Sequence, residues 1–288
     1  MDLAELLRPS RLTIVVDIGA NPIDGTPPYK RLLESRLCQV IGFEPQLTAL
    51  DRLNSRKSDL ERYLPYVVGD GAKATLNVCK ASGMTSLLTP DPLTLAQFPM
   101  FSEWGQVVQQ IPMATHRLDE VTEISAIDFL KTDAQGSELA IFKNGRNRLK
   151  DTIAVHTEVS FIPLYKDQPL YGEVDAEMRA LGFVPHAFAS INRRMIRPLS
   201  GENAYQALNQ IMEAENQIME ADVVYVRGFM HPERMSPEQL KHLATVAHFC
   251  YGSFDLAANC IYNLIRTEAV QKDAITRYLT ALQKLKPL

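Results

Sequence analysis

Cysteines and long apolar runs are both scarce in this sequence. Its 288 residues include four cysteines, none of which forms a CxxC pair or a cluster with histidine, and this excludes the familiar zinc motifs. We expect buried free thiols and a reducing, cytoplasmic location. The longest apolar stretches have the length of a strand, far short of a membrane span. Because no basic region precedes an apolar run at the N-terminus, we predict neither a secretory signal nor a membrane partner.

A surplus of basic residues is also missing. The chain has 30 Lys and Arg against 34 Asp and Glu, which gives a net charge of -4. A mildly acidic protein has no general attraction for a phosphate backbone, so we expect no nucleic-acid partner, although net charge leaves a local basic groove open. Hydrophobic residues (46%) and charged residues (22%) have the proportions of an ordinary globular protein.

Short apolar runs alternate with helix-like segments over the first two thirds of the chain. Such runs are typical of strands buried on both faces of a sheet. We predict strands at residues 12–18, 39–43, 66–68, 75–79, 127–132, 153–159, 183–189 and 222–227. The alternation predicts a mostly parallel, doubly wound α/β sheet, and the last two runs are expected to pair as an antiparallel edge.

Two segments depart from this alternation. Residues 83–112 are rich in Pro, Thr, Phe and Met without a clean period, and we predict a long irregular loop that covers a site. Nearer the C-terminus, Ser236 and Pro237 mark the start of a helical segment. We therefore predict a main domain at residues 1–230 and a helical extension at residues 231–288. Packing, homodimerisation or partner binding is the expected role of the extension.

Acidic residues and glycines follow the first predicted strands. Asp17 and Gly19 end the first strand, Glu44 ends the second, and Asp70 lies in a Gly-Asp-Gly turn after the third. Ligands of open parallel sheets bind beyond the carboxyl ends of the strands. The phosphate-binding patterns G-x-x-x-x-G-K-[ST] and G-x-G-x-x-G are both missing. An acid such as Asp17 repels pyrophosphate but suits a cationic cofactor, which favours S-adenosylmethionine over a dinucleotide.

Two of these acids, and a third that follows a later strand, are assigned to parts of that cofactor or of its site. Glu44 can accept hydrogen bonds from both ribose hydroxyls. Asp70 is expected near the adenine ring. Asp133 ends the strand at 127–132 and is expected to face the same cleft as Asp17 and Glu44.

The order and spacing of several segments resemble those of a known family. VVDIGAN at residues 15–21, GFEPQ at 42–46 and IDFLKTDAQGSE at 127–138 are similar to the motifs of the FkbM methyltransferase family. The resemblance implies a Rossmann-like class I methyltransferase fold with S-adenosylmethionine as its cofactor. It also implies O-methylation of a hydroxyl, so we expect a sugar, polyketide, glycan or other small-molecule acceptor. The family pattern assigns three further residues to cofactor binding: Asn21, Thr85 and Ser86.

Methyl transfer to a hydroxyl needs a base as well as alignment of the reacting atoms. The candidates are Asp133, Glu158 and His156. Strand alternation places His156 and Glu158 on one face, and a buried core histidine is the competing interpretation of His156. Lys131 either pairs with an acid of the sheet or takes part in catalysis. The acids do not form a convincing metal-binding set, so we predict no metal.

Two other functions stay open at this point. One is an NAD-dependent or sugar-nucleotide enzyme on a similar sheet, although the missing G-x-G-x-x-G pattern argues against it. The other is a non-catalytic cofactor-binding scaffold whose helical tail recruits a partner. Such a scaffold would keep Glu44 and the glycines but would transfer no methyl group.

Overall fold

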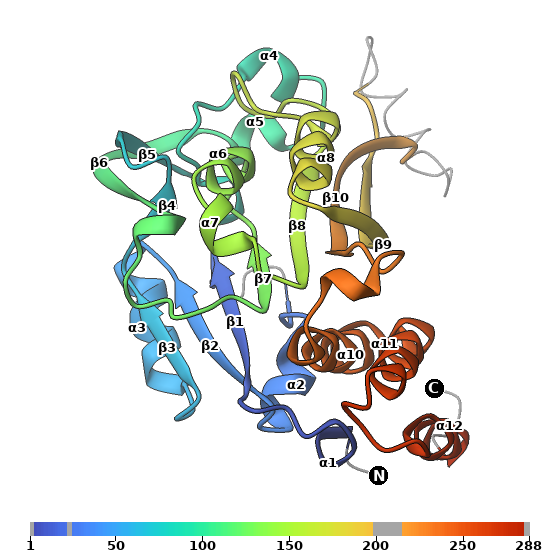
Figure 1. The fold of residues 1–288 in the computed structure, drawn as a ribbon. Coiled ribbons are helices and arrows are strands. Elements are labelled where there is room, and N and C mark those ends of the chain that lie inside the picture. The colour runs from blue at the N-terminus through green and yellow to red at the C-terminus, as the bar shows by residue number, and fades with distance from the viewer. Residues whose placement is uncertain (1–2, 22–24, 198–214, 285–288) are drawn as a thin grey trace.

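Seven strands form the main sheet of the computed structural model, which describes residues 3–21, 25–197 and 215–284. Their order is β3-β2-β1-β7-β8-β10-β9, and β10 runs antiparallel to both neighbours while the other pairs are parallel. The strands are β1 (Thr13–Ile18), β2 (Cys38–Phe43), β3 (Glu61–Leu64), β7 (Phe129–Thr132), β8 (Ala154–Ser160), β9 (Phe183–Arg194) and β10 (Gln217–Arg227). This order confirms the predicted Rossmann-like sheet with an antiparallel edge (Figure 1).

Helices cover both faces of this sheet. Consecutive side chains of a strand point to opposite faces, so a central strand contributes to two cores. All six residues of β1 are buried, with Val15 in one core and Val16 in the other. The Val15 core includes Leu243 and Leu264 from the C-terminal helices, whereas the Val16 core includes Phe142 from the opposite layer. The helices are α1 (Leu3–Leu7), α2 (Lys30–Glu34), α3 (Leu47–Arg56), α4 (Pro92–Leu95), α5 (Phe101–Trp104), α6 (Glu138–Lys143), α7 (Arg146–Leu149), α8 (Tyr171–Ala180), α10 (Pro237–Tyr251), α11 (Phe254–Arg266) and α12 (Ala274–Lys284), with short 3-10 helices η1 (Ser82–Met84), η2 (Leu118–Glu120) and η3 (Pro232–Arg234).

The C-terminal helices begin where the sequence predicts. The Ser236 side chain caps α10 by accepting a hydrogen bond from the Gln239 amide at 3.2 Å, and Gly252 ends the helix in the left-handed conformation. Since α10 and α11 share a core with β1, the predicted helical extension covers one face of the main sheet (Figure 1). The domain boundary at residue 230 stays a prediction. In the described part of the chain, no helix combines the length and apolar character that crossing a bilayer requires.

A small second sheet corrects two sequence predictions. It has the order β4-β6-β5, with β4 at Val67–Gly69, β5 at Lys73–Cys79 and β6 at Val107–Arg117. The run at 66–68 belongs to this sheet, so its prediction as the third strand of the main sheet is wrong. That position is occupied by β3, of which only Leu64 is buried. The region 83–112, predicted as an irregular loop, contains α4, α5 and the start of β6. The apolar signal of β6 is weak because most of its residues are exposed or half-buried.

Candidate functional site

Three strand ends meet at the point where the strand order reverses. Ile18, the last residue of β1, pairs with the last residue of β2 on one side and of β7 on the other. Gly19, Glu44 and Asp133 follow these strand ends directly, so they lie together at one edge of the main sheet. Ligands of doubly wound sheets bind in the crevice at this switch point.

Gly19 allows the ends of β1 and β7 to approach each other. Its φ of +78° lies in the left-handed region, and a Cβ added there would be 2.0 Å from the carbonyl oxygen of Asp133. The amides of Gly19 and Ala20 both donate to the carbonyl of Phe43 at 3.1 Å, which ties the turn to β2. Any side chain at position 19 would therefore push Asp133 away from the end of β1.

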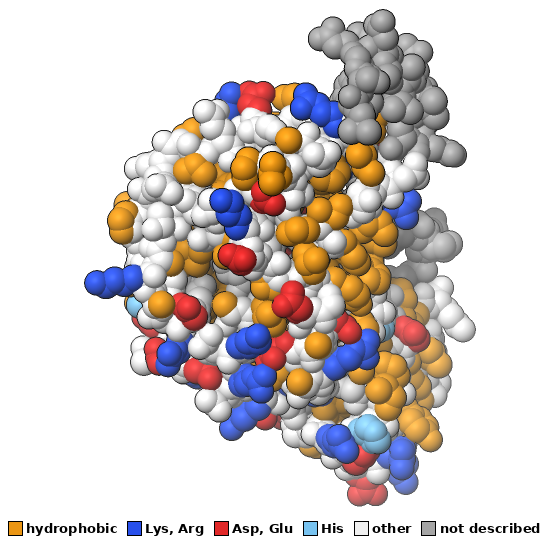
Figure 2. Space-filling model, turned by 90° about the horizontal axis from the view of Figure 1, so that it is seen from above, with side chains coloured by type: hydrophobic (Ala, Val, Ile, Leu, Met, Phe, Trp, Pro, Cys, Tyr) orange, Lys and Arg blue, Asp and Glu red, His pale blue; other side chains and the backbone are white. Residues whose placement is uncertain are grey.

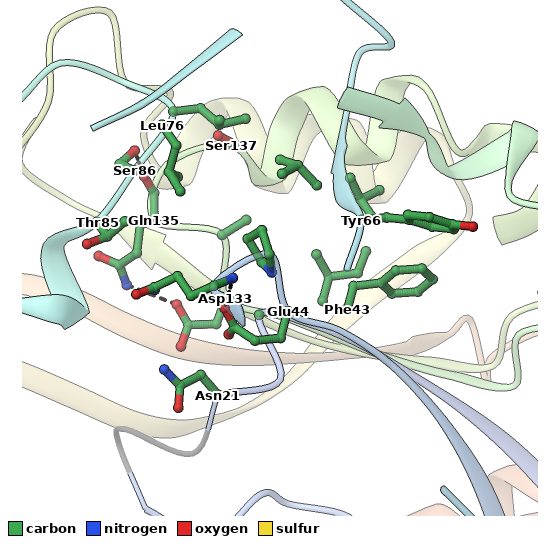
Figure 3. A pocket seen from close by; sticks show the side chains of 18 of the residues that line it. Asn21, Phe43, Glu44, Tyr66, Leu76, Thr85, Ser86, Asp133, Gln135 and Ser137 are labelled. Atoms are coloured by element: carbon green, nitrogen blue, oxygen red, sulfur yellow. Dashed lines mark hydrogen bonds between the residues drawn. The ribbon is translucent and has the colours of Figure 1, made fainter. Parts of the chain in front are cut away.

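A cavity opens beyond these strand ends, and we name it the strand-end cavity. Figure 3 shows Thr85 and Gln135 on one side of it, Phe43 and Tyr66 on the other, and Glu44 and Asp133 between them. Six of the predicted cofactor-binding residues line this cavity: Gly19, Asn21, Glu44, Thr85, Ser86 and Asp133. The cavity thus combines a polar side with an apolar side.

Glu44 is the most buried carboxylate of this cavity, with 3% of the residue exposed. Its Oε1 accepts a hydrogen bond from the Gln46 amide at 2.7 Å, which fixes the orientation of the carboxylate. Burial raises the pKa of Glu44, and the hydrogen bonds from backbone amides oppose that rise. Glu44 therefore lies at the strand end where the sequence predicts it, with one carboxylate oxygen held by the backbone.

Asp70 is placed elsewhere. It is absent from the described lining of the strand-end cavity, and it is exposed. Its Oδ1 accepts hydrogen bonds from the Ala72 amide at 2.9 Å and from the Thr115 hydroxyl at 3.2 Å. These contacts are those of a turn-forming aspartate, and the adenine role predicted for Asp70 gains no support from its position.

Asp17 is absent from the described lining of the strand-end cavity and is 2% exposed. The Tyr29 hydroxyl donates to its Oδ2 at 2.6 Å, and the Lys131 ammonium lies 3.4 Å from its Oδ1. The same ammonium donates to the Gly19 carbonyl at 3.0 Å and lies 3.8 Å from Asp133. Burial alone would lower the pKa of Lys131, but the charges of Asp17 and Asp133 raise it. Of the two interpretations of Lys131, the geometry matches pairing with acids of the sheet.

Gln135 connects the two carboxylates that the sequence proposes as bases. Its Nε2 donates to Asp133 at 2.9 Å and to Glu158 at 3.2 Å, while its Oε1 lies 3.1 Å from the Tyr165 hydroxyl. Its φ is +49°, and its carbonyl accepts a hydrogen bond from the Ser86 hydroxyl at 2.6 Å. Gln135 lies inside the IDFLKTDAQGSE segment but is not predicted from the sequence, because an amide does not titrate.

The environment of Glu158 disfavours its ionised form. Burial and then the neighbouring charge of Asp133 raise the pKa of Glu158 well above its ordinary value. Glu158 is not among the described residues that line the strand-end cavity, and it reaches Asp133 only through Gln135. It is therefore a half-buried acid next to the site rather than a wall of the site.

A second cavity, which we name the histidine cavity, adjoins the first. Its polar lining includes Asn21, Asp17, Lys131, Asp133, His156 and Asp222, and the end of α10 contributes Tyr251. Asn21 and Asp133 line both cavities, so the two meet at these residues. A ligand in one cavity would therefore share contacts with a ligand in the other.

His156 is held on both sides within this cavity. Its Nδ1 lies 3.1 Å from the Tyr251 hydroxyl, and its Nε2 lies 3.5 Å from Asp222. Burial alone would raise the pKa of Asp222, but hydrogen bonds from His156 and Ser190 lower it. These contacts agree with a satisfied buried histidine, and they also place the ring at a cavity wall. Within the described residues, no group of three or more His, Cys, Asp or Glu side chains could hold a metal ion.

Comparison with known proteins points to one family. The model of the methyltransferase FkbM domain matches residues 17–185. Among solved structures, magnesium protoporphyrin IX methyltransferase from Synechocystis PCC 6803 is 8% identical, with 78% of this chain and 76% of that chain covered and a TM-score of 0.38. A TehB-like methyltransferase from Corynebacterium glutamicum is 9% identical, with 78% and 85% covered and a TM-score of 0.33. Among curated proteins, none matches the sequence.

Proposed function

The chain belongs to the FkbM family of methyltransferase domains, and from this premise we propose that it transfers a methyl group from S-adenosylmethionine to a hydroxyl. The acceptor in this proposal is a sugar, a polyketide or another small metabolite. The observation that carries the proposal is the strand-end cavity, in which an oriented, buried carboxylate faces an apolar wall at the switch point of the sheet.

The residues present fit the proposed cofactor. A carboxylate held as Glu44 is held can accept hydrogen bonds from ribose hydroxyls. Phe43, Val68 and Leu76 line the same cavity and supply apolar surface for a base. S-adenosylmethionine would supply a methyl group on a cationic sulfonium, which suits a pocket with negative side chains. Asn21, in the loop that follows β1, is our candidate for contact with the amino-acid end.

We assign the acceptor to the histidine cavity, because Asn21 and Asp133 line it together with the strand-end cavity. An acceptor hydroxyl beside Asp133 would donate its proton to that carboxylate, which then acts as the general base. Glu158 suits this role less, because its raised pKa keeps it protonated to a higher pH. His156 has both ring nitrogens occupied and would position the acceptor.

Ligand-dependent melting tests the cofactor assignment. A ligand that binds the folded state alone stabilises it by about 2.7 kcal/mol at one hundred times its Kd. We expect S-adenosylmethionine and S-adenosylhomocysteine to raise the melting temperature and NAD to leave it unchanged. Glu44→Gln should weaken S-adenosylmethionine binding about 10- to 100-fold, the equivalent of losing charged hydrogen bonds of about 1.5–3 kcal/mol.

The matched control is Glu34→Gln, which removes an exposed carboxylate of α2 that lies 3.7 Å from Lys30. This variant should bind S-adenosylmethionine as the wild type does. Stabilisation by NAD in place of S-adenosylmethionine would favour the oxidoreductase alternative. Equal affinity of the two glutamine variants would remove Glu44 from the ribose site.

A further inference from the structure

A third cavity, the basic cavity, lies between α2 and α3. The described residues that line it include four cations, Lys30, Arg52, Arg56 and Lys57, and a single acid, Glu61. The whole chain carries a net charge of -4, so this surplus of positive charge is local. The face seen in Figure 2, by contrast, carries acidic and basic side chains interspersed.

The acid of this cavity forms no ion pair with its cations among the described residues. Glu61 accepts hydrogen bonds from the amide and hydroxyl of Ser58, both at 2.7 Å, and from the Tyr63 hydroxyl at 2.8 Å. No ion pair joins Glu61 to a cation among the described residues, and Lys30 lies 3.7 Å from Glu34 on its own helix. The carboxylate is therefore already used to hold the start of β3.

Three of the cations keep their charge uncompensated within the described residues. Arg52 donates to the Thr48 carbonyl at 3.2 Å and Lys57 donates to the Asn54 side chain at 3.0 Å, and both acceptors are neutral. The Arg56 side chain makes no hydrogen bond or ion pair with the described part of the chain. Arg36, outside this cavity, shows the alternative: it contacts both oxygens of Asp59, at 3.0 and 2.7 Å.

The spacing of the two arginines is unfavourable unless an anion lies between them. Arg52 and Arg56 are four residues apart on α3, so they share one helix face, where like charges repel. Two guanidinium groups on one face present several N–H donors in a geometry that suits phosphate oxygens. Lys30 and Lys57 border the same cavity, so a group with two or more negative charges fits it best.

The basic cavity borders the site assigned to the acceptor. The residues that line both the basic cavity and the histidine cavity are Ala20, Asn21, Gly25, Thr26 and Pro27. We propose that the basic cavity is the subsite for a phosphate or pyrophosphate group carried by the methyl acceptor. The link to the acceptor rests on the proposed function, whereas anion binding at α3 does not.

The test uses inorganic pyrophosphate as the probe, at fixed ionic strength, with binding to the full chain measured by calorimetry. We expect the double variant Arg52→Gln/Arg56→Gln to bind pyrophosphate at least about tenfold more weakly than the wild type. The charge-matched control Arg266→Gln/Arg277→Gln removes two exposed arginines of α11 and α12 and should bind as the wild type does. Absence of binding to the wild type, or equal losses in both double variants, would overturn the subsite.

Binding of S-adenosylmethionine separates this inference from the proposed function. Both double variants should bind S-adenosylmethionine like the wild type, because the altered residues lie outside the strand-end cavity. If pyrophosphate binds as expected and S-adenosylmethionine does not, the link to a methyl acceptor falls.

Vesicles containing phosphatidylglycerol should sediment no more protein than phosphatidylcholine vesicles. If the wild type binds the anionic vesicles and the Arg52→Gln/Arg56→Gln variant does not, the cavity binds a lipid headgroup. That result would overturn the proposal of a free phosphorylated acceptor.

Discussion

Replacing Gly19 with alanine should reduce the free energy of unfolding by about 2–5 kcal/mol, and the structure separates this loss into two parts. The left-handed backbone at φ +78° costs a residue with a Cβ about 1–2 kcal/mol. The new Cβ would also lie 2.0 Å from the Asp133 carbonyl oxygen, so the ends of β1 and β7 must separate by about 1.5 Å to reach an ordinary contact. That movement stretches the hydrogen bond from the Asp133 amide to the Ile18 carbonyl, now 3.0 Å, and an unsatisfied buried group costs about 1–3 kcal/mol.

Urea denaturation of Gly19→Ala and Gly252→Ala distinguishes the two parts. Gly252 has a φ of +60°, and a Cβ added there would meet its nearest neighbour at 3.8 Å, an ordinary contact. Gly252→Ala should therefore lose only the backbone part, about 1–2 kcal/mol. Calorimetry should also show weaker S-adenosylmethionine binding by Gly19→Ala, because Asp133 moves. Equal losses of stability in the two variants would refute the close approach at Gly19.

Two other predictions concern Glu158 and the C-terminal helices. The raised pKa of Glu158 means that its stabilising protonated form is fully present below its unfolded pKa of about 4.3 and is lost as pH rises through the folded value. Glu158→Gln should therefore increase the free energy of unfolding relative to the wild type more at pH 8 than at pH 5 in urea titrations, and a pH-independent difference would contradict this. Leu264→Ala, at a fully buried position of α11, should cost about 2–5 kcal/mol in one cooperative transition, whereas a separate early transition would show that α11 does not share the core of the sheet.

The strand ends of the site could be predicted because their signal is local. Each of β1, β2 and β7 is a short apolar run followed by an acid or a glycine, and the parallel sheet brings such endings to one edge. Glu44 and Asp133 therefore lie where the sequence predicts, at the strand-end cavity. No pairing between distant segments had to be known for that result, beyond the order expected of βαβ units.

The remaining parts of the site depend on contacts between segments that are distant in sequence. Tyr251 reaches His156 across 95 residues, and nothing in the helical pattern of α10 marks its last residue as the wall of a cavity. The strand β6 escapes prediction for a related reason. Its residues are mostly exposed or half-buried, so its position is set by pairing with β5 rather than by an apolar run of its own.

The contacts of Asp17 change which carboxylates favour a cationic cofactor. Asp17 favours a cationic ligand in the sequence, but the structure places Lys131 3.4 Å from it, so this pair is close to neutral. Glu44 and Asp133 are the carboxylates left facing the strand-end cavity. A cavity of that sign repels phosphate at the sheet edge, and the cations of α2 and α3 lie outside it. In our proposal, an acceptor with a phosphate group would thus place its anion toward α3 and its neutral hydroxyl toward Asp133.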